Sequence, residues 1–127
     1  MTIKDQTKEL QYQIMLSYRD AMGLESFGLM SSQAWYDDPK RLAFTLSRYK
    51  FVAKILAGSK NVLEIGCADA FAKRVVLQEV EKLTAIDFDP LFIEDAKVRM
   101  SDRWKFECFV HNMLSGSVPG KYDGLIS

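Results

Sequence analysis

The stretch NVLEIGCADAF, residues 61–71, decides the fold of this chain. Its residues 62–65 form a short, mainly apolar run that stops at Gly66, which is typical of a buried strand in a parallel sheet. Apolar residues then recur at helical spacing across residues 70–80. The stretch therefore predicts a strand, a tight turn and a helix. Open α/β folds hold nucleotide-sized ligands at such a turn, beside a helix N-terminus.

The residues that follow repeat the alternation of strand and helix. Residues 83–87 predict a second strand that ends on Asp87, and the pair Asp89-Pro90 predicts a helix that runs to about residue 100. Residues 104–110 and 122–127 predict a third and a fourth strand. This order implies a parallel sheet with right-handed crossovers.

Residues 5–22 have the pattern of an amphipathic helix that stops at Gly23. Its apolar stripe has three alternative uses: packing on its own domain, a contact in an oligomer, or a cover over the mouth of a site.

Residues 24–37 show little periodicity, so we interpret them as a linker or lid. The pair Asp38-Pro39 predicts the start of a further helix, which runs to about residue 57. The chain is thus divided into an N-terminal helix and linker, residues 1–37, and an α/β domain, residues 38–127.

Composition sets limits on location and partners. The 17 basic and 17 acidic residues give a formal net charge of zero, so no global field favours nucleic acid or an anionic membrane. The two cysteines, Cys67 and Cys108, have neither metal-ligand spacing nor a secretory context, which favours a reduced, cytoplasmic protein. No apolar run has the length that a membrane span requires.

Four segments together carry a resemblance to a known family. VLEIGCADA resembles the first motif of class I S-adenosylmethionine-dependent methyltransferases, and AIDFDP resembles their second. The segments HNML and KYDGLIS resemble the regions of their third and fourth strands. The resemblance implies a Rossmann-like three-layer α/β sandwich with strand order 3-2-1-4, truncated after the fourth strand. Residues 35–56 also resemble methyltransferases linked to bacterial surface-polysaccharide biosynthesis.

The resemblance implies that S-adenosyl-L-methionine is the cofactor and that the turn after the first strand holds it. Gly66 brings the backbone close to the methionyl part, with Cys67 and Ala68 beside it in the turn. Glu64 either meets the ammonium group of the ligand or makes a structural hydrogen bond to the loop. Arg48 resembles an arginine with which some relatives hold the ligand's carboxylate, although a solvated helix face is the favoured explanation.

The second and third strands are expected to supply the nucleoside contacts. Asp87 is placed to accept hydrogen bonds from both ribose hydroxyls. Phe88 either lies against adenine or is buried. Asn112, followed by Met113, offers an amide oxygen to the adenine amino group. The single histidine, His111, is more simply explained as a surface or core residue than as a catalyst.

The turn departs from the G-x-G-x-G pattern of the family, because Ala68 and Ala70 replace two of its glycines. We expect alanine to follow the same path only where φ is negative, and we expect its methyl group to narrow the space left for the ligand.

Three functions remain open from the sequence. The first is a methyltransferase that acts on a small molecule or sugar-type acceptor. The second is a nicotinamide-dependent oxidoreductase, which is disfavoured because Phe71 stands where G-x-G-x-x-G requires its third glycine. The third is a non-catalytic nucleotide-binding or assembly subunit. No catalytic residue and no metal site are predicted.

The fourth predicted strand, residues 122–127, lies at an edge of the sheet. Apolar side chains at an unpaired edge are a liability for aggregation. We therefore expect either a fragment of a longer domain or a homodimer formed through this strand or the N-terminal helix, with at least ~1,000 Å² buried.

Overall fold

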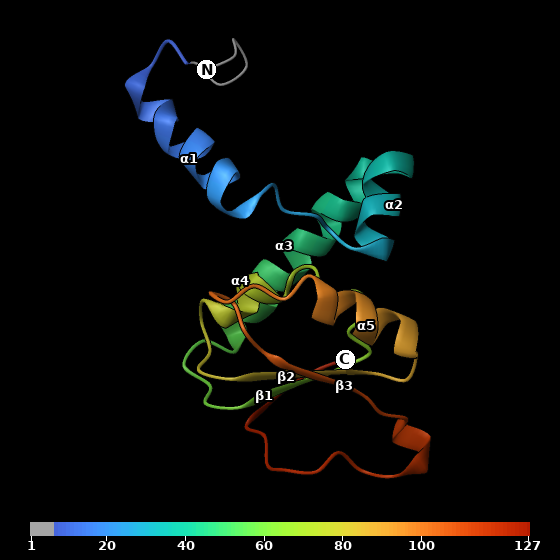
Figure 1. Ribbon diagram of the computed structural model, residues 1–127. Coiled ribbons are helices and arrows are strands. Elements are labelled where there is room, and N and C mark those ends of the chain that lie inside the picture. The colour runs from blue at the N-terminus through green and yellow to red at the C-terminus, as the bar shows by residue number, and fades with distance from the viewer. Residues whose placement is uncertain (1–6) are drawn as a thin grey trace.

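Four parallel strands form the sheet at the centre of the computed structural model, which describes residues 7–127 (Figure 1). The strands are β1 (Val62–Ile65), β2 (Leu83–Asp87), β3 (Glu107–Val110) and β4 (Gly124–Ile126). They lie in the order β3-β2-β1-β4, and all three pairs are parallel. The predicted Rossmann-like α/β fold and strand order 3-2-1-4 are therefore confirmed.

The two outer strands are shorter than predicted. β3 pairs with β2 only from Glu107, opposite Thr84, to Val110, opposite Asp87. A bend in which the N–H of Trp104 donates to the carbonyl oxygen of Ser101 comes before this strand. The predicted strand over residues 104–110 is thus wrong for its first three residues.

At β4, the strand predicted for residues 122–127 is limited to Gly124–Ile126. The preceding Asp123 instead uses its carboxylate to accept hydrogen bonds from the backbone N–H groups of Lys60 and Asn61.

Three helices lie on the same side of the sheet in Figure 1: α3 (Pro39–Ile55), α4 (Lys73–Leu77) and α5 (Pro90–Val98). Their inward side chains bury the apolar face of the strands, with Val62, Val76 and Leu83 at the centre of the larger cluster. Asp89 caps α5 as predicted, because its Oδ1 accepts from the N–H of Leu91 at 3.0 Å. Asp38 precedes α3 as predicted, but its side chain makes no capping bond.

The helix predicted from residue 70 begins only at Lys73. Ala70 has φ +57°, a left-handed conformation that cannot be part of a right-handed helix. The turn after β1 therefore extends to Ala72, and α4 is short.

The interpretation of residues 24–37 as a linker or lid is wrong for their second part, which is the helix α2 (Leu29–Asp37). Gly28, at its N-cap, has no side chain to offer the first turn. Two distant carboxylates serve instead: Asp95 accepts from the N–H of Leu29 at 3.0 Å and Asp69 from the N–H of Ser31 at 2.7 Å. These partners satisfy N–H groups that a helix leaves unpaired at its start.

The N-terminal helix is shorter than the predicted 5–22. A 3-10 turn, η2 (Leu10–Tyr12), leads into α1 (Gln13–Met22), which stops at Gly23 as predicted; residues 5 and 6 lie outside the described residues. No residue of α1 is buried, and the helix extends away from the sheet in Figure 1. Its stripe therefore does not pack on the body of its own domain.

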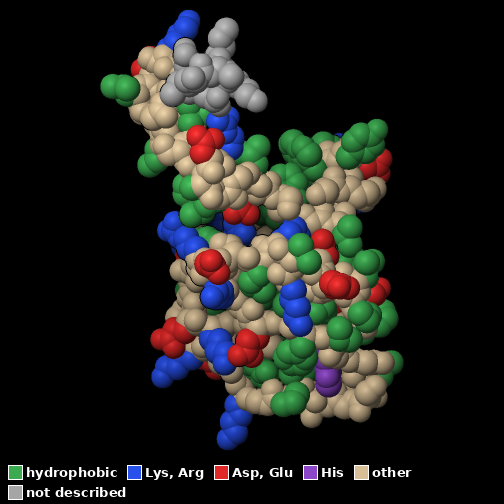
Figure 2. All heavy atoms as spheres, in the orientation of Figure 1, with side chains coloured by type: hydrophobic (Ala, Val, Ile, Leu, Met, Phe, Trp, Pro, Cys, Tyr) green, Lys and Arg blue, Asp and Glu red, His purple; other side chains and the backbone are tan. Residues whose placement is uncertain are grey.

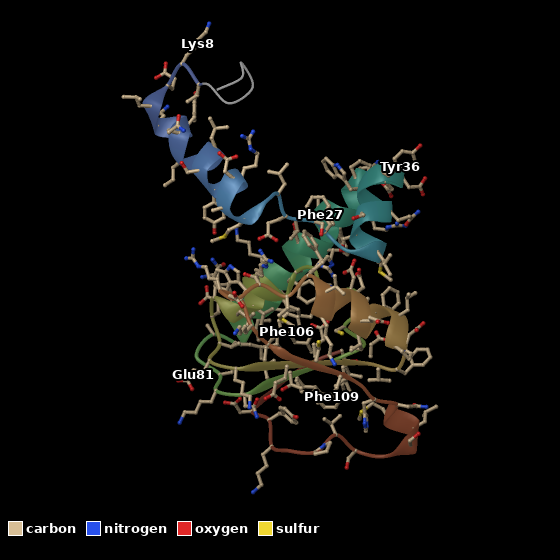
Figure 3. All side chains as sticks on the ribbon, in the orientation of Figure 1. Lys8, Phe27, Tyr36, Glu81, Phe106 and Phe109 are labelled. Carbon is tan, nitrogen blue, oxygen red and sulfur yellow. The ribbon has the colours of Figure 1, made fainter. Side chains whose placement is uncertain are left out.

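Apolar side chains also cover the outer side of α2 (Figure 2). Tyr36, at the end of α2, points away from the body of the protein (Figure 3). The ring of Phe27, which precedes α2, packs on the ring of Phe71 in the turn after β1. Among residues 7–127, no helix is both long and apolar enough to pass through a bilayer.

Candidate functional site

A hollow of about 330 Å³ opens where β1, β2 and β3 end. It is lined by Ile65, Gly66, Ile86, Asp87, Phe88, His111, Asn112, Met113 and Leu114. These residues come from three separate parts of the chain because the carboxyl ends of parallel strands meet at one edge. Five of the nine residues predicted for the site are among them: Gly66, Asp87, Phe88, Asn112 and Met113.

Gly66 leaves its side of the hollow open. Its φ is +76°, a conformation that favours glycine, and a Cβ added there would meet no atom within 4 Å. Its N–H donates to the carbonyl oxygen of Ile86 at 2.9 Å, which ties the turn to β2. The path of the backbone thus favours glycine at this position, and the space beside it is free for a ligand.

Asp87 both lines the hollow and shapes the turn. Its Oδ2 accepts from the N–H of Ala68 at 3.0 Å, and its Oδ1 accepts from the N–H of Asp89 at 3.0 Å. A carboxylate oxygen has two lone pairs, so each can accept one further hydrogen bond. The side chain is almost fully buried, at 8 % exposed. A diol that reached it would find an acceptor that is already held in place.

The rim of the hollow is apolar. Phe88 is 73 % exposed and Leu114 is 96 % exposed, so of the two alternatives for Phe88 burial is wrong. Asn112 is held by a local bond, because its Oδ1 accepts from the N–H of Leu114 at 3.0 Å at the start of η3 (Met113–Ser115). The Nε2 of His111 lies 2.9 Å from the carbonyl oxygen of Gly116. Because a carbonyl oxygen can only accept, Nε2 is the donor of this bond, which holds the loop that follows His111.

Glu64 does not line the hollow. Its Oε1 lies 2.7 Å from the Nζ of Lys73 and accepts from the hydroxyl of Tyr49 at 2.6 Å. The Lys73 ammonium also donates to the Tyr49 hydroxyl at 2.9 Å and lies 4.0 Å from the centre of its ring. Both Glu64 and Lys73 are 1 % exposed. These contacts are structural, but they join Glu64 to α3 and α4 and not to the loop; its Oε2 is buried and has no hydrogen-bond partner among the described residues.

Lys73 was not predicted as a partner of Glu64, although the sequence contains a signal for it. It lies three residues before Val76 and seven before Val80, so it shares their inward stripe. A lysine on a buried stripe requires a carboxylate partner, and Glu64 is the acidic residue of the neighbouring strand.

Cys67 and Ala70 are buried and Ala68 is half-buried, and none of the three lines the hollow. Burial raises the pKa of Cys67 to about 12, so its thiol stays protonated and is a poor nucleophile. Ala68 and Ala70 have φ +49° and +57°. The expectation that alanine follows this path only at negative φ is therefore wrong: both alanines adopt the left-handed region, at a cost in strain.

Arg48 lies on an exposed part of α3, and its guanidinium carbon lies 5.3 Å from the ring centre of Tyr49. It does not line the hollow. Among the described residues, no group of three or more histidine, cysteine or acidic side chains is arranged to hold a metal ion.

The chain is similar to solved structures, although not to family models or curated proteins. No family model matches the sequence, and no curated protein matches it significantly. Among solved structures, the chain is similar to the N-methyltransferase NodS from Bradyrhizobium japonicum WM9 in complex with S-adenosyl-L-homocysteine. The identity is 24 %, the TM-score is 0.58, and the match covers 70 % of this chain and 45 % of NodS.

The chain is also similar to two further solved structures. StiE O-MT is 23 % identical, with a TM-score of 0.57, over 80 % of this chain and 41 % of that one. A dimethyladenosine transferase from Plasmodium falciparum is 26 % identical, with a TM-score of 0.51, over 65 % of this chain and 30 % of that one. The chain therefore spans less than half the length of each of these structures.

Proposed function

We propose that this chain, which has the fold of the class I S-adenosylmethionine-dependent methyltransferases, binds S-adenosyl-L-methionine in the hollow at the edge of the sheet. The observation that carries the proposal is that Gly66, Asp87 and Asn112 meet at one hollow in this fold, although they lie far apart in the sequence. The volume of the hollow falls within the range of about 300–1,000 Å³ that is usual for small-molecule sites.

The residues present fit this ligand. The free space beside Gly66 admits the methionyl chain, and the held carboxylate of Asp87 accepts from the ribose hydroxyls. The exposed ring of Phe88 and the side chain of Leu114 offer apolar surfaces to adenine, and Asn112 lies beside them. When bound, the cofactor supplies an activated methyl group, and the protein contributes by positioning an acceptor near it.

We propose that the acceptor is a small molecule or a sugar-type compound, with a role in cell-surface polysaccharide biosynthesis. The similarity to an N-methyltransferase and to an O-MT supports nitrogen or oxygen as the atom that receives the methyl group. A formal net charge of zero favours a small acceptor over the polyanionic backbone of a nucleic acid.

Calorimetry with S-adenosylhomocysteine and, separately, with NAD tests the proposal. We expect S-adenosylhomocysteine to bind and NAD to be rejected, because the ring of Phe71 packs against Phe27 at 5.0 Å where a dinucleotide turn requires a glycine. Binding of NAD alone would establish the oxidoreductase alternative. If neither ligand binds, the assembly role remains.

We also propose that two copies associate through the edge of β4 or through α1, in a reducing, cytoplasmic compartment. Leu125 on β4 is 59 % exposed, α1 has no buried residue, and both cysteines are free thiols. Light scattering at micromolar concentration tests the association, and a monomeric mass would contradict it.

A further inference from the structure

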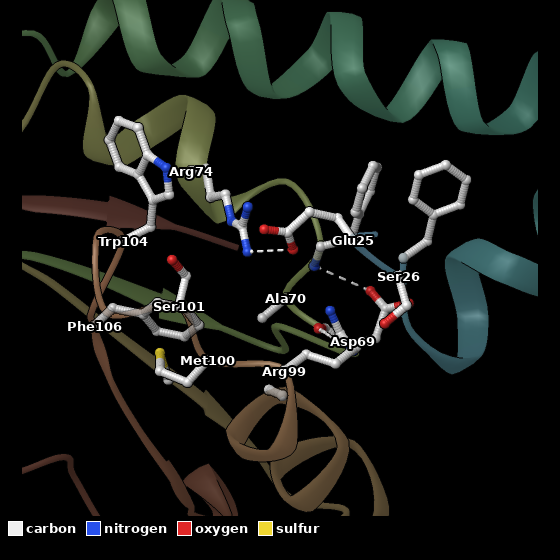
Figure 4. A pocket seen from close by; sticks show the side chains of 13 residues that line it. Glu25, Ser26, Asp69, Ala70, Arg74, Arg99, Met100, Ser101, Trp104 and Phe106 are labelled. Atoms are coloured by element: carbon white, nitrogen blue, oxygen red, sulfur yellow. Dashed lines mark hydrogen bonds and ion pairs between the residues drawn. The ribbon is translucent and has the colours of Figure 1, made fainter. Parts of the chain in front are cut away.

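Residues 25–31, here called the strap, run from the end of the connection after α1 into the first turn of α2 and cross the turn after β1. Side chains of the strap contact both α4 and the turn after β1. Glu25 pairs with Arg74 of α4 at 3.0 Å, and the ring of Phe27 packs on that of Phe71 at 5.0 Å. Figure 4 shows Glu25 and Arg74 across a small cavity of about 100 Å³ from Asp69 and Arg99. The strap therefore contacts the turn directly.

Asp69 is the centre of this attachment. Its Oδ2 accepts from the N–H of Ser31 at 2.7 Å, and its Oδ1 accepts from the Ser31 hydroxyl and from the N–H of Phe71, both at 3.2 Å. Asp69 is only 5 % exposed. It stands between Ala68 and Ala70, the two residues with left-handed backbone. A side chain fixed at this position restricts the backbone on both of its sides.

A second set of contacts joins the same elements to α5. Arg99 donates to the carbonyl oxygen of Asp69 and pairs with Asp95 at 3.2 Å, and Asp95 also accepts from the N–H of Leu29 in the strap. Gly28 makes this approach possible, because a Cβ there would lie 2.6 Å from the Arg99 guanidinium and 2.9 Å from the Asp69 Cβ. Strap, turn and α5 thus form one connected network.

The network continues to the hollow. The N–H of Ala68, next to Asp69, donates to Oδ2 of Asp87, and Asp87 lines the hollow. Contacts therefore run from Ser31 through Asp69 and Ala68 to the carboxylate that we assign to the ribose. Strained backbone at a binding site persists only where its surroundings hold it in place.

We propose that the strap holds the turn in its strained, ligand-accepting conformation, with Asp69 as the positioning residue, so that docking of the strap and binding of the cofactor are coupled. This inference rests on the proposed function. Coupling between two sites is reciprocal, so a ligand in the hollow also tightens the strap, although no strap residue lines the hollow.

Hydrogen exchange and calorimetry on the full chain test this inference with Asp69→Asn and Ser31→Ala. An asparagine has one acceptor oxygen, so it cannot accept from both the N–H of Ser31, which binds Oδ2 of Asp69, and the N–H of Phe71, which binds Oδ1. Without ligand, we expect Asp69→Asn to speed amide exchange in residues 25–31 and 66–71 together. We expect affinity for S-adenosylhomocysteine to fall about tenfold, within the range of about 5–150-fold that is typical of coupling between two sites. Asp102→Asn and Ser47→Ala, at exposed positions, are the matched controls.

The ligand-induced change separates positioning from a general loss of stability. In the unmodified chain, S-adenosylhomocysteine should slow exchange in residues 25–31, and in Asp69→Asn this protection should be lost. If Asp69→Asn does not fold, Ser31→Ala removes a single hydrogen bond and should give smaller shifts of the same sign in both segments.

The inference would be overturned if Asp69→Asn speeds amide exchange in residues 25–31 but leaves the exchange of residues 66–71 unchanged. Full ligand-induced protection of residues 25–31 in Asp69→Asn would also overturn it. If the unmodified chain does not bind S-adenosylhomocysteine, the proposed function fails. The ligand-free exchange of the two segments still decides whether the strap holds the turn.

Discussion

The left-handed alanines of the turn lead to a quantitative prediction about stability. Left-handed backbone costs a residue with a Cβ about 1–2 kcal/mol, and glycine escapes this cost. Glycine loses about 0.5–1 kcal/mol more conformational entropy on folding than alanine does. The difference predicts that Ala68→Gly, at φ +49°, raises the free energy of unfolding by up to about 1.5 kcal/mol. At Ala70, which is 7 % exposed, loss of a buried methyl offsets about 0.8 kcal/mol of the gain.

Urea denaturation followed by circular dichroism measures the effect. A higher midpoint with an unchanged slope reports a gain in stability alone. Ala43→Gly is the matched control, because Ala43 is exposed in the interior of α3 and the change should cost about 1 kcal/mol there. The free energy of unfolding should therefore rise in Ala68→Gly and fall in Ala43→Gly, although both variants replace alanine with glycine.

A loss of stability in Ala68→Gly as large as that in Ala43→Gly would refute the left-handed assignment. The same variants test whether the alanine methyl groups crowd the ligand. If they do, Ala68→Gly and Ala70→Gly together should bind S-adenosylhomocysteine more tightly. Unchanged affinity would leave backbone strain as the only effect of the alanines.

Three further predictions concern carboxylates and their partners. Asp87→Ala should weaken binding of S-adenosylhomocysteine by about 1.5–3 kcal/mol in calorimetry, and it should also lower stability, because the N–H groups of Ala68 and Asp89 lose their acceptor; an unchanged affinity would remove Asp87 from the site. Lys73→Met should cost about 3–5 kcal/mol in urea denaturation by leaving Glu64 charged and unpaired, and adding Glu64→Gln should recover most of this loss, whereas no recovery would mean that the pair is not the cause. The N–H groups of Lys60 and Asn61 hold the pKa of Asp123 below its ordinary value of 3.8. Asp123 therefore stabilises the fold at neutral pH, and this contribution is lost as the pH falls below about 4; Asp123→Asn should be less stable than the unmodified chain at pH 7 and approach it at pH 3 in thermal unfolding.

The sheet could be predicted from the sequence because its signals are local. Each of the first two strands is a short apolar run that ends on a glycine or a carboxylate, and α5 starts with its own cap at Asp89. The hollow followed from the order of the strands, since their carboxyl ends share an edge. The resemblance to the methyltransferase family predicted Gly66, Asp87 and Asn112 as site residues, and the structure brings them together at one hollow.

Helix α2 could not be predicted in this way because its stabilising partners are distant in sequence. Its N-cap is a glycine, its first-turn N–H groups bind Asp69 and Asp95, and its buried positions are limited to Ser31 and Ala34. A pattern with so few apolar positions resembles that of a loop. The helix forms since the fold brings two carboxylates to its N-terminus, where they satisfy the backbone and interact favourably with the helix dipole.

Glu64 illustrates the same limit for the site itself. Its place at the end of β1 was compatible with a ligand contact or with a structural bond, and the choice between them depended on a side chain nine residues later. The Lys73 ammonium and the Tyr49 hydroxyl both use Oε1 of Glu64, inside the layer between α3, α4 and the sheet. A carboxylate neutralised in this way has little remaining attraction for a second cation. If the proposed site binds S-adenosyl-L-methionine, we therefore expect its ammonium group to be held mainly by acceptors other than Glu64.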